Sequence, residues 1–253
     1  MGKYLILGGS SGIGKSIAKI CLQNSKEVII TGRNEEKLLN ANRELCKIGK
    51  SSSLKIDLGD LKNVDLQIDQ FIQTHKLIDG LVINGPLPPL KSFESSSMED
   101  WLYSTNSTIL SSVLIIKKLL SCFNKESSIV FILSDTCRSA GVAKSISTSL
   151  RLALSGLMKS LAIEYASDKI RFNAISPGPT LTDRAKSLFE NGAKKQNISY
   201  EEFKDNFTKT LPSKRLIDPS EIADLVYYLL SKKSSSLTGV NIPFDGALTQ
   251  IPL

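Results

Sequence analysis

Two serines and an arginine between residues 134 and 151 are the side chains of this sequence best suited to chemistry on a polar bond. Ser147 lies thirteen residues after Ser134, and Arg151 lies four residues after Ser147. A serine hydroxyl can position a substrate carbonyl, whereas an arginine guanidinium stays protonated and cannot shuttle protons. A serine side chain is shorter than a tyrosine side chain, and its hydroxyl is a weaker acid than a phenol. Ser147 would therefore reach a carbonyl only through a water molecule. The segment therefore offers carbonyl binding without an evident proton donor.

Charged side chains near these positions are candidates for substrate contacts. Asp135 and Arg138 follow the first serine, and Asp183 and Arg184 follow the stretch 177–182. A carboxylate can carry protons when its pKa is raised, and an arginine can polarise a carbonyl or bind a carboxylate. Solvated loop charges are the alternative for all four residues.

A glycine-rich turn near the amino terminus has the composition of a phosphate-binding loop. It follows an apolar run at 3–7 and precedes a helical pattern at 13–24. Glycines let the backbone approach a pyrophosphate, and the helix N-terminus supplies free N–H groups and the positive end of its dipole. A purely structural turn is the alternative. We predict cofactor contacts from Gly8, Ser10, Ser11, Gly12, Ile13 and Gly14.

The end of the second apolar run indicates which dinucleotide is bound. An acidic residue at this point hydrogen-bonds the adenosine ribose and favours NAD(H), whereas a cation favours the 2′-phosphate of NADP(H). Gly32 stands in the acidic position and is followed by Arg33 and Asn34. The planar guanidinium of Arg33 can bind a phosphate through paired hydrogen bonds. We therefore predict NADP(H) rather than NAD(H), with Arg33 as a plain surface residue as the alternative.

Strands and helices must alternate along the chain to position these residues. Apolar runs predict strands at 3–7, 27–31, 52–56, 79–83, 128–133, 170–175 and 239–243. Apolar residues at helical spacing predict helices at 13–24, 35–47, 60–75, 97–123, 146–166, 200–209 and 219–231. The alternation predicts an α/β fold, a Rossmann-like doubly wound parallel sheet with helices on both faces, in a single domain over 1–253. The polar, lysine-rich segment 180–210 is predicted to be a mobile substrate lid.

Composition argues against several classes of function. The net charge of +7 is spread over lysine pairs without interleaved aromatic residues, so we expect no nucleic-acid partner. No apolar stretch reaches the roughly 18 residues of a membrane span, and the chain enters its first strand without a signal peptide. The single histidine and the spacing of the four cysteines predict no metal site. We expect a cytoplasmic protein with reduced thiols that acts on a small molecule.

The motifs resemble the short-chain dehydrogenase/reductase family along nearly all of the chain. The resemblance is carried by the glycine spacing at 8–14, by Trp101 and Asn106 on the helix at 97–123, and by the closing segments. One departure is the turn after the fourth strand, where Asn84 matches the family and Pro86 does not. The proline either alters a wall beside the cofactor ribose or shapes the substrate entrance.

The resemblance implies roles for further residues. Asn106 would support a proton-relay water, and Asp57 would contact the adenine amino group. The helices at 97–123 and 146–166 would pair between subunits, which implies a homodimer or homotetramer. The other cofactor contacts that it implies are Leu58, Asn84, Gly85, Arg151, Pro177, Gly178, Thr180 and Thr182.

The catalytic signature of that family is only partly present. It consists of a serine, a tyrosine thirteen residues later and a lysine four residues after the tyrosine. Ser134 matches the serine, but Ser147 stands in the tyrosine position and Arg151 in the lysine position. No tyrosine lies between Tyr103 and Tyr165, so a shifted register cannot restore the motif. The chain is most similar to a divergent branch of the family labelled 3-oxoacyl-acyl-carrier-protein reductase-like.

Three functions agree with these observations. The first is an NADP(H)-dependent oxidoreductase of a carbonyl or alcohol, which would use Ser134, Ser147, Arg151, Asn106 and a water or non-standard acid. The second is a catalytically silent nucleotide-binding sensor or scaffold subunit, because the proton donor is missing. The third is a non-redox lyase or isomerase, which would need a dedicated acid or base such as Asp183.

Overall fold

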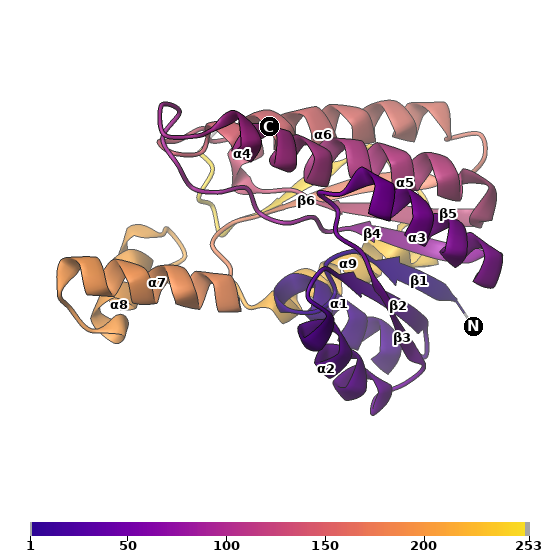
Figure 1. Cartoon of the computed structure of the whole chain (residues 1–253), viewed down its shortest axis with the longest axis horizontal. Helices are drawn as coiled ribbons and strands as arrows, with labels where there is room; N and C mark the ends of the chain where they lie inside the picture. Colours follow the sequence, from indigo (N-terminus) through magenta and orange to yellow (C-terminus); the bar gives the residue numbers. More distant parts are fainter. Residues whose placement is uncertain (1, 251–253) are drawn as a thin grey trace.

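A parallel sheet of seven strands forms the centre of the computed structural model, which describes residues 2–250 (Figure 1). The strand order is β3-β2-β1-β4-β5-β6-β7. The order reverses between β1 and β4, and this point opens a crevice at the carboxyl ends of the strands. The strands are β1 (Lys3–Ile6), β2 (Glu27–Gly32), β3 (Ser51–Lys55), β4 (Ile78–Ile83), β5 (Phe123–Ile132), β6 (Arg171–Pro177) and β7 (Asn241–Phe244). The predicted doubly wound fold is confirmed.

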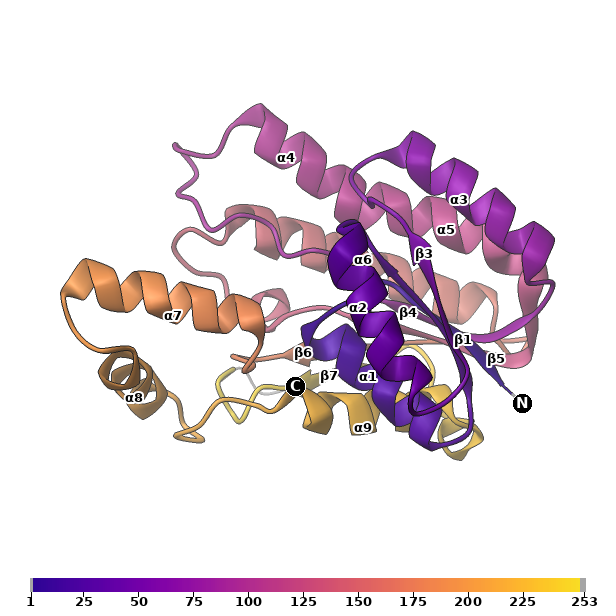
Figure 2. The same ribbon diagram turned by 60° about the horizontal axis from the view of Figure 1, so that its bottom comes forward.

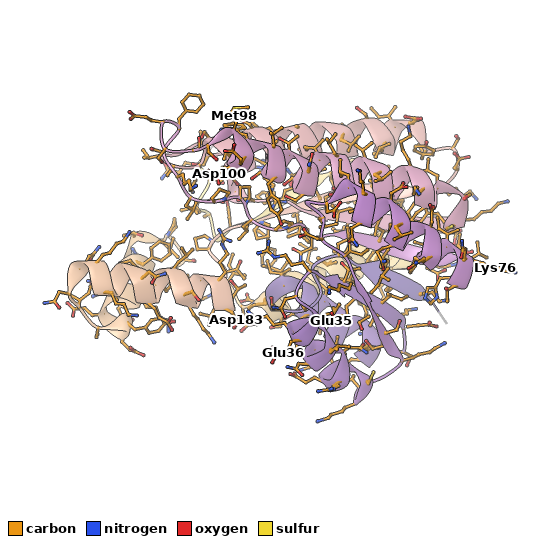
Figure 3. All side chains as sticks on the ribbon, viewed as in Figure 1. Glu35, Glu36, Lys76, Met98, Asp100 and Asp183 are labelled. Atoms are coloured by element: carbon orange, nitrogen blue, oxygen red, sulfur yellow. The ribbon has the colours of Figure 1, made fainter. Side chains whose placement is uncertain are left out.

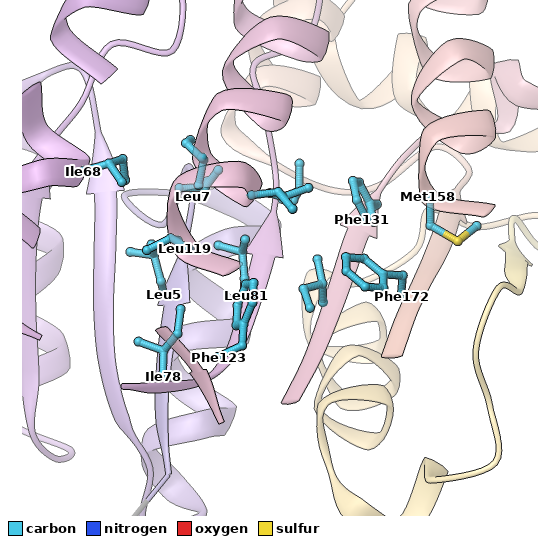
Figure 4. Close-up of a cluster of buried hydrophobic side chains, with 14 of the residues drawn as sticks. Leu5, Leu7, Ile68, Ile78, Leu81, Leu119, Phe123, Phe131, Met158 and Phe172 are labelled. Carbon is cyan, nitrogen blue, oxygen red and sulfur yellow. The ribbon is translucent and has the colours of Figure 1, made fainter. Parts of the chain in front are cut away.

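Helices cover both faces of the sheet. Side chains alternate between the faces along each strand, so each face presents apolar side chains that a layer of helices buries. Leu5 packs into one buried cluster, part of which is drawn in Figure 4, and the adjacent Ile6 packs into the cluster on the other face. The first cluster is covered by α3 (Leu61–Thr74), α5 (Ser111–Leu119) and α6 (Ser145–Glu164). The second is covered by α1 (Gly12–Gln23), α2 (Glu35–Cys46) and α9 (Pro219–Leu230).

The segment predicted as one helix at 97–123 is helical from Met98 to Leu119, with a π-helical turn inside it. The chain forms α4 (Met98–Thr105), then a π-helical turn over Asn106–Leu110, then α5. Around this turn, the Ser112 hydroxyl donates to the carbonyl oxygen of Thr108 at 2.6 Å. Such side-chain bonds to the preceding turn bend a helix, which apolar periodicity does not reveal. A short 3-10 turn ends the segment, and β5 begins at Phe123 rather than at 128.

The segment predicted as a lid contains two helices, α7 (Asp183–Gln196) and α8 (Tyr200–Thr210), which stand out from the body of the molecule (Figure 2). The periodicity predicts only the second. Phe189 on α7 packs against Phe203 and Phe207 on α8, with ring centroids 5.7 and 5.0 Å apart. Helix α7 buries Phe189 and Ala193.

Within residues 2–250, no helix is both long enough and apolar enough to cross a membrane. The same part of the chain holds no group of three or more His, Cys, Asp or Glu side chains that could bind a metal ion. The four cysteines are unpaired, with Cys21 and Cys122 buried and Cys46 exposed.

Candidate functional site

A cavity of about 750 Å3 opens at the carboxyl ends of the strands, where the strand order reverses. Loops that follow β1, β2, β3, β4, β5 and β6 form its walls, and the helices α7 and α8 close one side. Most of the predicted site residues line it, although they come from distant parts of the chain. They are Gly8, Ser10, Ser11, Gly12, Ile13, Arg33, Asp57, Leu58, Asn84, Gly85, Pro86, Ser134, Asp135, Arg151, Pro177, Gly178, Thr180, Thr182, Asp183 and Arg184.

The glycine loop has the shape of a phosphate cradle. A Cβ atom on Gly8 would collide with the carbonyl oxygen of Asn84, and one on Gly14 would collide with the carbonyl oxygen of Gly8. Gly14 therefore lies behind the cavity wall and lets the loop close tightly. Ser11 precedes α1 without a side-chain capping bond, so the N–H groups of the first turn remain free for an anion.

A hydrogen-bonded chain of three side chains spans the cavity edge where β2 and β3 end. Nη1 of Arg33 donates to the Tyr103 hydroxyl at 2.8 Å, and this hydroxyl donates to Oδ1 of Asp57 at 3.2 Å. Burial and the neighbouring Asp57 raise the pKa of Tyr103, so the phenol stays neutral. Sequence reasoning gave Tyr103 no part in the site; its place one helical turn before Asn106 is the signal that could have linked it to the site.

Ser134 points toward a carboxylate inside the cavity. Its hydroxyl donates to Oδ1 of Asp135 at 2.7 Å and accepts from the N–H of Thr136 at 3.3 Å. Oδ2 of Asp135 lies 3.6 Å from Nζ of Lys144, which also lines the cavity. Sequence reasoning missed Lys144, because it lies in a turn with no periodic pattern.

Ser147 and Arg138 lie outside the cavity lining in the described part of the chain. The Ser147 hydroxyl is 3.3 Å from the hydroxyl of Thr136. Arg138 points to the last strand, where its Nη2 donates to the carbonyl oxygen of Asn241 at 2.7 Å. The spacing of the sequence motif thus places Ser147 near the site, but its hydroxyl contacts that of Thr136 and does not line the cavity.

Two further predicted residues have structural partners. The Asn34 side chain accepts from the N–H of Lys37 at 2.9 Å and caps α2. Asn106 begins the π-helical turn, and its Nδ2 donates to the carbonyl oxygen of Gly59 at 3.4 Å. Neither residue lines the cavity, among the residues that the structure describes.

Arg151 is a buried cation with no carboxylate partner among residues 2–250. Its side chain is only 2% exposed, and burial lowers its pKa to about 10, so it stays charged at neutral pH. Nη1 donates to the carbonyl oxygen of Ile132 at 2.9 Å, and Nη2 to that of Pro86 at 3.4 Å. The Nε atom has no partner, which leaves donors free for a ligand in the cavity.

The side of the cavity that α7 and α8 form has both charged and apolar side chains. Asp183 stands at the start of α7, where the lid joins the body (Figure 3). Arg184 follows it, and its Nη2 reaches across to the carbonyl oxygen of Pro88 at 3.1 Å. Burial lowers the pKa of Arg184. The apolar lining that sequence reasoning missed comprises Leu87, Leu90, Leu188, Phe189, Phe203, Phe207 and Leu216.

Comparison with known proteins agrees with this geometry. A family model described as enoyl-(acyl carrier protein) reductase matches residues 8–249. The oxidoreductase UcpA of Salmonella typhimurium is 30% identical over 249 residues, which cover 97% of this chain and 93% of the relative. The 3-oxoacyl-[acyl-carrier-protein] reductase FabG of Chlamydia pneumoniae is 28% identical over 252 residues, which cover 98% of this chain and 96% of the relative.

A solved structure has the same fold and a sequence identity similar to that of these relatives. The structure of a short chain dehydrogenase family protein from Francisella tularensis subsp. tularensis SCHU S4 is 30% identical, with a TM-score of 0.88. The match covers 99% of this chain and 100% of that chain. The sequence motifs, the doubly wound sheet and these matches lead to one conclusion. The chain belongs to the short-chain dehydrogenase/reductase family.

Proposed function

We propose that this protein is an NADP(H)-dependent oxidoreductase that interconverts a carbonyl and an alcohol. The observation that carries the proposal is the cavity edge at the end of β2, where Arg33 stands beside Gly32 and a phosphate cradle lies next to them. A guanidinium there favours a 2′-phosphate, whereas NAD(H) would be held by a carboxylate at that point.

The lining fits such a dinucleotide from end to end. The glycine loop and the free N–H groups of α1 would hold the pyrophosphate, and Asp57 with Leu58 would hold the adenine. Asn84, Gly85 and Arg151 would hold the nicotinamide ribose. The nicotinamide carboxamide would contact Pro177, Gly178, Thr180 and Thr182. When bound, the nicotinamide supplies or accepts the hydride at the carbonyl carbon.

The chain's own residues must then move one proton at the substrate oxygen. In the direction of oxidation, the Ser134 hydroxyl takes the alcohol proton while its own proton passes to Asp135, 2.7 Å away. Reduction runs the same transfers backwards, and Lys144 links Asp135 to solvent. Arg151 supplies a fixed positive charge near the site without exchanging a proton. Ser147 and Asn106 lie behind this relay and would act on it only through water.

Cofactor binding and turnover test the proposal together. Calorimetry should give tighter binding of NADPH than of NADH, and absorbance at the reduced nicotinamide band should fall when a panel of ketones, aldehydes and 3-oxoacyl thioesters is added. Tighter binding of NADH would contradict the cofactor assignment. Binding of NADPH without oxidation on any carbonyl would contradict the enzymatic part.

One observation favours a second function, a nucleotide-binding sensor or scaffold subunit. Ser147 stands where the family has its tyrosine, and it contacts Thr136 rather than the cavity. Binding without turnover, together with a partner that is recovered from cell extract only when NADPH is present, would support this alternative.

A further inference from the structure

We propose that Tyr103 is the residue that makes the cavity selective for a 2′-phosphate. It does so by holding the guanidinium of Arg33 in place and keeping it apart from the carboxylate of Asp57. This inference rests on the proposed dinucleotide function, which does not by itself assign any role to Tyr103.

Tyr103 joins the side chains that follow β2 and β3 through its hydroxyl. Its hydroxyl accepts from Nη1 of Arg33 at 2.8 Å and donates to Oδ1 of Asp57 at 3.2 Å. Its ring lies against Gly59, where a Cβ atom would collide with the ring. Helix α4 thus sends one side chain between the ends of β2 and β3, at the edge of the cavity.

The hydrogen bond from Arg33 to the Tyr103 phenol lowers the entropic cost of phosphate binding, because it orders an exposed arginine side chain in advance. A free arginine side chain samples many rotamers, and ordering it on a ligand costs conformational entropy. The bond to Tyr103 uses one N–H of Arg33 and leaves the other donors of the planar fork available. The guanidinium is therefore ordered before the phosphate arrives.

The phenol also separates a cation from an anion. In the described residues, Arg33 and Asp57 form no direct ion pair, because the Tyr103 hydroxyl lies between them. Direct pairing would satisfy both groups with each other and remove them from the ligand. With Tyr103 in place, Asp57 is instead anchored by the N–H of Gly59 at 2.9 Å. Both charged groups thus keep capacity for the adenosine end of a dinucleotide.

Two small probes separate this role from general nucleotide binding. Adenosine 2′,5′-bisphosphate carries the 2′-phosphate, and ADP does not. Calorimetric titration of the wild-type chain with both probes measures the selectivity ratio that we assign to Arg33 and Tyr103. Neither titration requires a substrate or turnover.

Removing only the hydroxyl in Tyr103→Phe should weaken the bisphosphate by about tenfold, the worth of one hydrogen bond to a charged group. ADP should be weakened by a smaller factor, because it depends on Asp57 at the adenine but not on Arg33. In an Arg33→Met background, Tyr103→Phe should have no further effect on the bisphosphate. Tyr228→Phe is the matched control, because Tyr228 is an exposed tyrosine on α9 with its hydroxyl 3.3 Å from the carbonyl oxygen of Lys233. It should leave both probes unchanged.

Each other outcome counts against the inference. Equal weakening of both probes in Tyr103→Phe would mean that the hydroxyl does not contribute to selectivity for the 2′-phosphate and that Tyr103 has only a structural role. An unchanged bisphosphate affinity would mean that Arg33 is ordered without the phenol. If the wild-type chain binds both probes equally, the NADP(H) preference of the proposed function fails as well. A wild-type preference that survives Tyr103→Phe overturns only the role of Tyr103.

Discussion

The hydroxyl of Ser134 donates a hydrogen bond to Oδ1 of the next residue, Asp135, across 2.7 Å inside the cavity. The family places a tyrosine phenol near its serine, and here a carboxylate occupies the neighbourhood of that serine instead. Asp135 also lies 3.6 Å from the ammonium group of Lys144. The two contacts connect the Ser134 hydroxyl through Asp135 to the ammonium group of Lys144 without a tyrosine.

Replacing Asp135 by Asn should therefore stop proton transfer and spare cofactor binding. We expect Asp135→Asn to lower kcat by at least about 100-fold, the scale of general acid–base catalysis, with NADPH affinity within about twofold. Stopped-flow turnover and calorimetry measure the two quantities. The matched control is Asp168→Asn, which changes an exposed carboxylate after α6. Unchanged turnover in Asp135→Asn would remove the carboxylate from the mechanism.

Replacing Arg151 should affect the free energy of unfolding and the affinity for NADPH differently. Replacing it by methionine removes a buried charge that has no carboxylate partner, and it leaves the carbonyls of Ile132 and Pro86 without their donor. These effects oppose each other, so we expect the free energy of unfolding of Arg151→Met to stay within about 1 kcal/mol of the wild type. NADPH should bind at least tenfold more weakly. A loss of stability above about 2 kcal/mol with normal binding would make Arg151 a structural clamp.

The glycine loop gives a test of close backbone approach. A Cβ atom at position 14 would collide with the carbonyl oxygen of Gly8, so Gly14→Ala should destabilise the chain by about 2 kcal/mol and weaken NADPH binding. Gly156→Ala is the control, because a Cβ there meets nothing within 4 Å in the middle of α6. It should raise stability by up to about 1 kcal/mol. Urea denaturation compares the two, and equal effects would contradict the cradle geometry.

Thiol reactivity should separate the cysteines by burial. Burial raises the pKa of Cys21 to about 12, and Cys122 is also buried, whereas Cys46 is exposed. A disulfide reagent at pH 8 should modify Cys46 rapidly, and Cys21 only after unfolding in guanidinium chloride. Because the thiolate is the reactive form, Cys21 should stay protonated and unmodified in the native protein even at pH 9. Rapid labelling of Cys21 in the native protein would contradict its burial.

The predicted homodimer or homotetramer would use the exposed apolar side chains of α6. Leu152 is 49% and Ile163 71% exposed, and both lie on this helix. Charged residues are depleted from the centres of such interfaces, so Ile163→Asp should shift the protein toward the monomer. Light scattering after size-exclusion chromatography measures the mass. A wild-type monomer at micromolar concentration would contradict the predicted assembly.

Local patterns in the sequence were sufficient for the scaffold. The central strands were visible as apolar runs, because a parallel strand inside the sheet is buried on both faces, as β4 and β6 are. The glycine loop was visible because only glycine fits where Gly8 meets Asn84. Even the catalytic gap was visible, since Ser147 and Arg151 stand at fixed distances from Ser134 along the chain. The π-helical turn at Asn106–Leu110 was not, because the side-chain hydrogen bonds around it, such as that from Ser112 to Thr108, leave no mark in the apolar pattern.

By itself, the sequence determined the fold class, the glycine loop and the loss of the family tyrosine, because these follow from periodicity and from residue types at fixed spacing. Only the tertiary structure decided which side chains meet. Arg33 finds Tyr103 across 70 residues of sequence, and Arg151 finds Pro86 across 65. Lys144 reaches Asp135 because the turn before α6 folds back over β5. Such contacts depend on how distant elements pack, and no local pattern of residues encodes them.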